Sequence, residues 1–95
     1  MKYKAKKGDV IAICKRPCDI WTLGRAHRVT SKGLIDQFIF GNEGVIYSID
    51  NSVRIAVIGD SEKRIAAEKL LALQGGNPFN SADELKSAIN AMQAF

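Results

Sequence analysis

The sequence predicts an α+β protein in which a small antiparallel barrel of five short strands is followed by two C-terminal amphipathic helices. Turn signals rich in Gly, Asn and Asp divide the first part of the chain into β-branched segments at a spacing of about 8 to 12 residues, which is typical of small barrels. After Gly59 the hydrophobic period changes from two residues to about 3.6, which indicates helices. The length of 95 residues favours one domain and is too short for the larger nucleotide-binding and (β/α)8 folds.

Each expected strand is a short run of β-branched or aromatic residues between turn residues. Gly33 ends the three-residue turn 31–33 and suits the left-handed position that such hairpins require. Residues 15–23, which include Trp21, are expected to form a loop after the first strand. The five strands are expected at residues 10–14, 24–30, 34–40, 45–49 and 53–57.

The two helices are expected from their capping residues and their apolar stripes. Asp60 or Ser61 caps a first helix that runs to about Leu73, and the glycines that follow end it. A capping box at 81–84 begins the second helix, whose buried face is expected to hold Leu85, Ala88, Ile89 and Met92. A barrel of about 59 residues is marginally stable alone. We therefore expect a barrel with a basic N-terminal tail (1–59) and a helical hairpin (60–95) in one compact domain.

Basic residues are concentrated in the first third of the chain. The formal charge is +4, but residues 1–33 hold nine basic and two acidic side chains, a net of +7, and residues 34–95 hold five basic and eight acidic, a net of −3. A basic surface attracts phosphates through counterion release, and aromatic side chains among the basic ones can stack on unpaired bases. We therefore expect a non-enzymatic module that contacts nucleic acid through the first two strands and their loop. The expected binding residues are Lys15, Arg16, Trp21, Arg25, His27, Arg28 and Lys32.

Two alternatives to this interpretation stay open. The same basic surface fits an acidic protein partner, which would make the chain an adaptor or inhibitor, one encoded by a mobile element for example. The apolar stripes of the helices could instead pair with a second copy, so both a monomer and a homodimer are considered. Trp21 is either an exposed binding residue or a ring that plugs one end of the barrel.

Residues 7–44 resemble the SH3-like barrels, and among them the Tudor pattern. The resemblance rests on Lys7-Gly8-Asp9-Val10-Ile11-Ala12, then Trp21, then Arg25-Ala26-His27-Arg28-Val29, and then Phe38-Ile39-Phe40-Gly41-Asn42-Glu43. It implies a five-stranded barrel that binds a ligand. The spacing from Trp21 to Arg25 is longer than in that family, and only Phe40 stands where the family has an aspartate and a tyrosine. A methyl-ligand cage of the Tudor type would therefore be incomplete here.

The sequence gives little support for a metal site, a cofactor or an enzyme. Cys14 and Cys18 form a C-x3-C pair that could be combined with His27 and Asp19, but structural zinc sites usually have two paired sets of ligands. The interpretation preferred here is two thiols in a reducing compartment. His27 is the single histidine of the chain and lies among arginines, and no motif of an activated nucleophile surrounds it. We expect no catalytic residues.

Membrane and export signals are also weak. No apolar run approaches 18 residues. The lysine-rich start is followed by an apolar stretch of only five residues, which is too short for the core of a signal peptide. A cytoplasmic location without membrane contact is the expectation.

Overall fold

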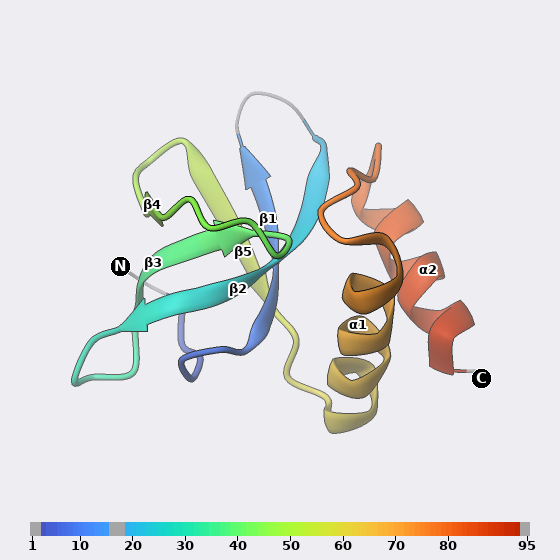
Figure 1. Cartoon of the computed structure of the whole chain (residues 1–95), viewed down its shortest axis with the longest axis horizontal. Coiled ribbons are helices and arrows are strands. Elements are labelled where there is room, and N and C mark those ends of the chain that lie inside the picture. The colour runs from blue at the N-terminus through green and yellow to red at the C-terminus, as the bar shows by residue number, and fades with distance from the viewer. Residues whose placement is uncertain (1–2, 16–18, 94–95) are drawn as a thin grey trace.

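The computed structural model describes residues 3–15 and 19–93 and confirms the expected α+β fold. Figure 1 shows the strands as a curled half-barrel on one side of the molecule and the two helices together on the other. The elements are β1 (Val10–Lys15), β2 (Trp21–Val29), β3 (Ile35–Phe40), β4 (Tyr47–Ser48), β5 (Val53–Val57), α1 (Ser61–Gln74) and α2 (Ala82–Gln93).

The five strands form one antiparallel sheet in the order β4-β3-β2-β1-β5, which is an SH3-like arrangement. Gly24 in β2 allows the neighbouring strands to approach closely. A Cβ atom at this position would overlap the carbonyl oxygen of Ile39 and lie 2.7 Å from Cδ1 of Ile13. Glycine is therefore required at this position, because Ile39 of β3 and Ile13 of β1 come this close to β2.

Two of the expected strand boundaries were wrong. β2 begins at Trp21, because the residues before Gly24 pair with β1 through Cys14↔Trp21 and Ala12↔Leu23. Trp21 therefore lies in a strand and not in the expected loop. β4 is reduced to two residues, since only Tyr47 and Ser48 pair with β3. The apolar alternation of 45–49 predicted a longer strand. Such a pattern reports burial and does not report pairing, and the described structure pairs neither Val45 nor Ile46 with β3.

β1 is the centre of the fold, because both of its faces are buried. Val10 and Ala12 face the helices, while Ile11 and Ile13 point into the barrel. The sheet therefore separates two apolar clusters. The helix-side cluster contains Val10, Ala12, Leu23, Ala66, Ala67, Leu70, Leu71, Leu85 and Ile89. The barrel cluster contains Ile11, Ile13, Ala26, Ile35, Phe38, Val53 and Ile55.

The described N-terminal residues belong to the sheet. Lys4 forms an antiparallel β-bridge with Leu34. Two backbone hydrogen bonds flank this bridge: Ala5 N donates to Gly33 O (3.1 Å), and Ile35 N donates to Tyr3 O (2.8 Å). The side chains of Tyr3 and Ala5 pack against the barrel cluster. This pairing fixes the lysine-rich segment, which was expected as a tail, at one end of the barrel.

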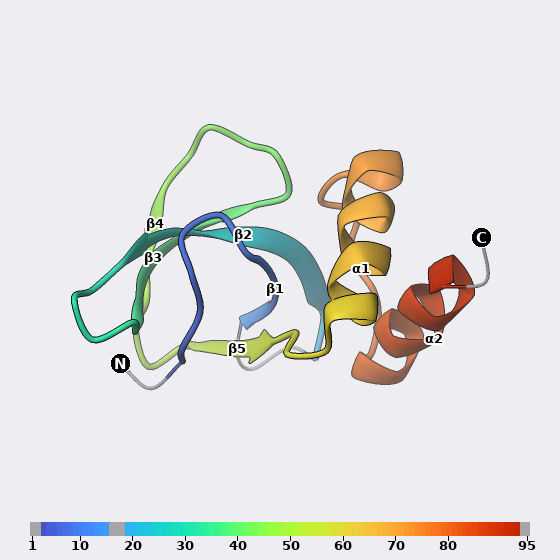
Figure 2. The same cartoon turned by 90° about the horizontal axis from the view of Figure 1, so that it is seen from below.

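The helices dock as a hairpin, with α1 against the sheet and α2 packed on α1 (Figure 2). Asp60 caps α1, its Oδ1 accepting from the backbone N–H groups of Glu62 and Lys63 at 2.9 and 3.1 Å. The expected capping box of α2 is present: Glu84 N donates to Ser81 Oγ (3.2 Å), and Glu84 Oε2 accepts from Asn80 N (3.0 Å). Among the described residues, no helix is long and apolar enough to span a membrane.

Candidate functional site

The residues expected to bind nucleic acid lie along the whole length of β2 and do not form one cluster. Lys15 and Trp21 lie at one end of this strand. Arg16 lies outside the described part of the chain. Lys32 lies in the turn at the other end. A strand of nine residues spans roughly 30 Å, so one phosphate group cannot contact both ends.

Arg25 lies between these ends and connects the barrel to α1. Its Nη1 and Nη2 donate to the two carboxylate oxygens of Glu68 at 2.8 and 2.7 Å, and Nη1 also donates to Gly8 O at 3.0 Å. The hydrogen bonds from Arg25 lower the pKa of Glu68, and those same bonds raise the pKa of Arg25. A guanidinium held by three acceptors is committed to this internal contact.

Arg28 and His27 lie nearer to the Lys32 end of the sheet. Arg28 Nε donates to Asp36 Oδ2 at 2.7 Å, and the Nη2 atom contacts the same oxygen. The Arg28 side chain nevertheless remains mostly exposed, at 63%, while His27 is half-buried. Arg28 therefore stays accessible to a further anion, although Asp36 neutralises part of its charge.

Trp21 joins the barrel to the helical hairpin. Its backbone pairs with Phe79 through two hydrogen bonds of 2.8 and 2.7 Å, and its indole Nε1 donates to Asp19 Oδ1 at 3.1 Å. The guanidinium of Arg54 lies 5.7 Å from the ring centroid, a cation–π distance. These contacts and the half-buried ring indicate that Trp21 is held by internal partners on several sides.

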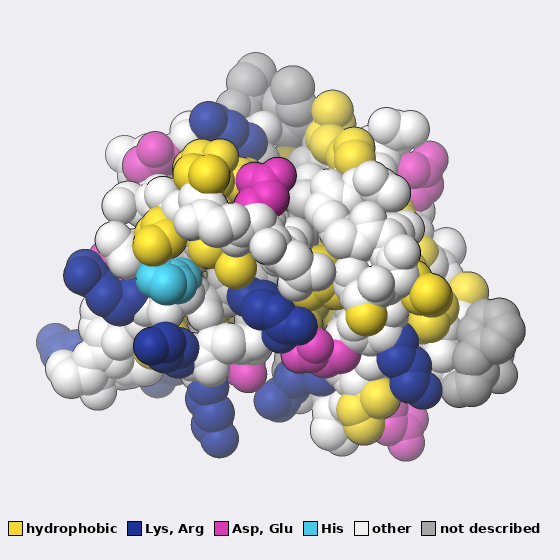
Figure 3. Space-filling model, viewed as in Figure 1, with side chains coloured by type: hydrophobic (Ala, Val, Ile, Leu, Met, Phe, Trp, Pro, Cys, Tyr) yellow, Lys and Arg dark blue, Asp and Glu magenta, His cyan; other side chains and the backbone are white. Residues whose placement is uncertain are grey.

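A hollow at the other end of the barrel gathers cations from two distant parts of the chain. It has a volume of about 410 Å³, and its basic lining residues are Lys4, Lys6 and Arg64. We call it the basic hollow. Figure 3 shows that most Lys and Arg side chains on the visible face of the molecule lie in the lower half of that face. Figure 1 places the N-terminal segment and the β5–α1 connection in the same region.

The charges of the basic hollow are poorly neutralised within the described residues. Its one acidic lining residue is Asp9, whose Oδ2 accepts a hydrogen bond from the backbone N–H of Lys6 at 2.8 Å. Arg64 Nη2 donates to Gly59 O at 3.1 Å, while its Nε is buried without a hydrogen-bond partner in the described structure. The three cations of the lining therefore outnumber its single carboxylate, which makes the hollow attractive to an anion.

Comparisons with known proteins add no relative: no family model, no curated protein and no solved structure matches this chain.

Arg64 was missed by the sequence reasoning, although a signal for it exists. Lys63 and Arg64 stand at the beginning of α1, where the helix dipole disfavours positive charge. A basic pair in that position costs stability and so indicates another role. Lys4 and Lys6 were assigned to a tail, because the bridge that holds this segment, Lys4↔Leu34, depends on a residue 30 positions away.

The metal-site alternative has no counterpart in the described residues. No group of three or more His, Cys, Asp or Glu side chains comes together in residues 3–15 and 19–93. Cys14 is buried, and its Sγ lies 3.4 Å from Nη2 of Arg54. Cys18 lies outside the described residues.

Proposed function

We propose that this protein is a small nucleic-acid-binding module that contacts the phosphate backbone at the basic hollow. The observation that carries the proposal is the convergence of Lys4, Lys6 and Arg64 on one hollow from opposite parts of the sequence. Lys and Arg contacts to phosphate supply most of the sequence-independent affinity of nucleic-acid-binding proteins. The proposal keeps the expected function but moves its centre away from Trp21.

The neighbouring surface extends the contact along the barrel. Gly33 lines the basic hollow, so the exposed Lys32 beside it lies at its margin. Arg28 lies at the same end of β2 and remains mostly exposed. A nucleic-acid strand that places one phosphate in the hollow can therefore place the next phosphates near these two cations.

Salt-dependent binding of an oligonucleotide tests this proposal. The probe is a fluorescent single-stranded oligonucleotide of mixed sequence, about 20 nucleotides long, which exceeds the roughly 4–16 nucleotides that one small barrel covers. Anisotropy titrations at about 50 and 200 mM salt are expected to show a steep loss of affinity with salt. A duplex of the same sequence, measured in parallel, shows whether single strands are preferred.

Charge reversal locates the contact. Lys6→Glu is expected to weaken binding about tenfold and to reduce the salt slope by about one, because one phosphate contact is lost. Lys69→Glu, on the exposed surface of α1, has the same change in net charge and is expected to have a small effect. The absence of binding at 50 mM salt would overturn the proposal, and equal effects of the two variants would remove the hollow as its site.

A further inference from the structure

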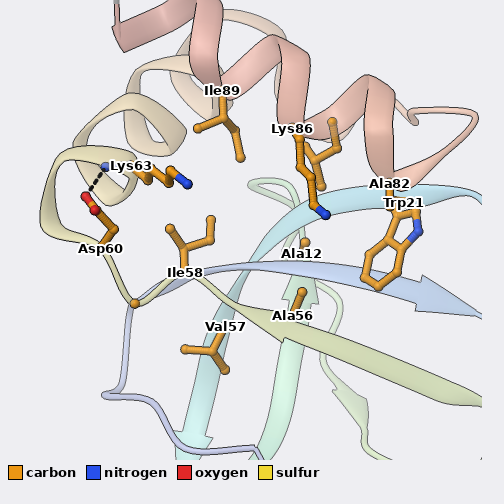
Figure 4. Close-up of a pocket in the computed structure, with 12 residues that line it drawn as sticks. Ala12, Trp21, Ala56, Val57, Ile58, Asp60, Lys63, Ala82, Lys86 and Ile89 are labelled. Atoms are coloured by element: carbon orange, nitrogen blue, oxygen red, sulfur yellow. Dashed lines mark hydrogen bonds between the residues drawn. The ribbon is translucent and has the colours of Figure 1, made fainter.

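A second cavity lies on the opposite side of the β5–α1 connection, between the outer face of β5 and α2. It has a volume of about 320 Å³, within the range of ligand-binding pockets. We call it the α2–β5 groove. Its apolar lining includes Ala12, Trp21, Ala56, Ile58, Leu85 and Ile89. Figure 4 shows the sheet residues as the floor of this groove and α2 as its wall.

Two lysines give the groove its charge. Figure 4 shows Lys63 of α1 and Lys86 of α2 extending from the helices toward the space above Ile58. Within the described residues neither ammonium group forms an ion pair. The acidic residue of the lining, Asp60, already accepts the capping hydrogen bonds of α1. The groove is therefore apolar inside and complementary to a carboxylate.

The edge of the sheet beside this groove is open. β5 is the last strand, with β1 on one side and no described segment paired on the other. The end of the strand is unusually apolar and exposed, since Val57 is 38% accessible and Ala56 is also exposed. Natural edge strands usually carry a charged side chain, a proline or a bulge that prevents pairing. The charged residue of β5 is Arg54, near its start, where it lies over the Trp21 ring, and residues 55–57 contain none of these three features.

From these three observations we infer that the α2–β5 groove binds a short, extended, acidic segment of a partner protein that pairs with the open edge of β5. Strand addition supplies main-chain hydrogen bonds, and alternate side chains of the added segment then face the groove. Apolar side chains at those positions would contact Ala56 and Ile58, and an adjacent Asp or Glu would reach Lys63 or Lys86. A polypeptide is favoured over a small amphiphile because only a polypeptide also uses the open strand edge.

Selection of peptides on the full chain tests this inference. A phage-displayed library of random peptides about 12 residues long, enough for a strand of roughly 40 Å, is panned on the immobilised protein. The enriched peptides are expected to alternate apolar residues and to contain Asp or Glu. Lys86→Glu is expected to weaken a selected peptide about tenfold, and Lys69→Glu, with the same charge change outside the groove, is expected to have little effect.

A second measurement separates strand addition from docking on the groove alone. Methylation of alternate backbone nitrogens in a selected peptide removes the donors that face β5, and we expect one of the two alternating sets to abolish binding. The inference fails if no peptides are enriched, if Lys86→Glu and Lys69→Glu act equally, or if neither methylated set matters. It also fails if light scattering shows that the unchanged protein is a dimer and that the Lys86→Glu variant is a monomer, because a second copy of the chain then occupies the groove. Val57, Ile58 and Gly59 line both the groove and the basic hollow, but Lys6 lines only the hollow. Lys6→Glu is therefore expected to leave peptide binding unchanged, which distinguishes this inference from the proposed function.

Discussion

Arg25 of β2 and Glu68 of α1 form a bidentate ion pair that joins the barrel to the helical hairpin, with nitrogen–oxygen distances of 2.8 and 2.7 Å. The two residues are 43 positions apart in the sequence. One comes from the strongly basic first third and the other from the acidic remainder. The charge asymmetry of the chain therefore serves in part as an internal attraction between its two halves.

This ion pair predicts a pH-dependent contribution to stability. The pKa of Glu68 lies below its ordinary value of 4.5 because Arg25 donates hydrogen bonds to the carboxylate. The contribution is therefore present above pH 4.5 and is lost as the pH falls through the lower folded-state value. Since Glu68 is about half exposed, we expect Glu68→Gln to lower the free energy of unfolding at pH 7 by about 1 kcal/mol or less. Urea unfolding at neutral and acidic pH is the measurement, and a difference that persists in acid would contradict the assignment.

Gly24 predicts a severe effect of a small substitution. Gly24→Ala places a methyl group against the Ile39 carbonyl oxygen, a backbone atom that cannot move without disturbing the sheet. We expect a loss of about 1–3 kcal/mol or more of stability, the range for overpacked sites. Gly44→Ala is the matched control, because a Cβ there meets nothing within 4 Å. Thermal unfolding of both variants, followed by circular dichroism, would show the difference as a lower Tm for Gly24→Ala alone.

The contacts of Phe79 predict that this residue stabilises the attachment of the helical hairpin to the barrel. Its backbone pairs with Trp21, and its half-buried ring packs on the helix-side cluster. Phe79→Ala is expected to cost about 2 kcal/mol, less than for a fully buried ring, and to shift the emission of Trp21 to longer wavelength as water enters. Leu73→Ala removes another large apolar side chain, but one that is 74% exposed, so its effect should stay within about 0.5 kcal/mol. Equal effects of the two substitutions would show that Phe79 does not hold the hairpin.

The capping geometry of Asp60 predicts how much one N-cap contributes to the free energy of unfolding. It accepts two backbone hydrogen bonds at the beginning of α1, and its replacement by alanine is expected to cost about 1 kcal/mol. Asp83→Ala in the first turn of α2 removes an acidic residue with only a dipole interaction, worth about 0.3–1 kcal/mol. Denaturant unfolding of the two variants under the same conditions distinguishes the roles. An Asp83→Ala loss larger than that of Asp60→Ala would contradict the capping geometry.

The fold class could be predicted from the sequence because its signals are local. The turn glycines and the two-residue period of 53–57 depend on neighbouring residues, and so does the capping box at Ser81 and Glu84. The start of β2 could not be predicted in the same way. Trp21 and the residues after it have no strong strand pattern, and their pairing is set by β1 and by Phe79, which is 58 positions further along the chain.

The candidate site was less accessible to sequence reasoning than the fold. The charge count correctly located an excess of cations in the first third, but it treated them as one surface. Folding separated Lys15 from Lys32 by the length of β2, paired Arg25 with Glu68, and brought Lys4 and Lys6 to Arg64.

The sequence by itself thus determined the order and type of the strands and helices, the barrel and the overall charge, since periodicity, turn chemistry and composition act over a few residues or add up independently of position. Only the tertiary structure decided which cations are neutralised and which remain available, because ion pairs and hollows form between side chains that the chain brings together from a distance. For the same reason, the open edge of β5 follows from the strand order of the folded sheet, and Lys63 and Lys86 come together beside it only when the helices dock.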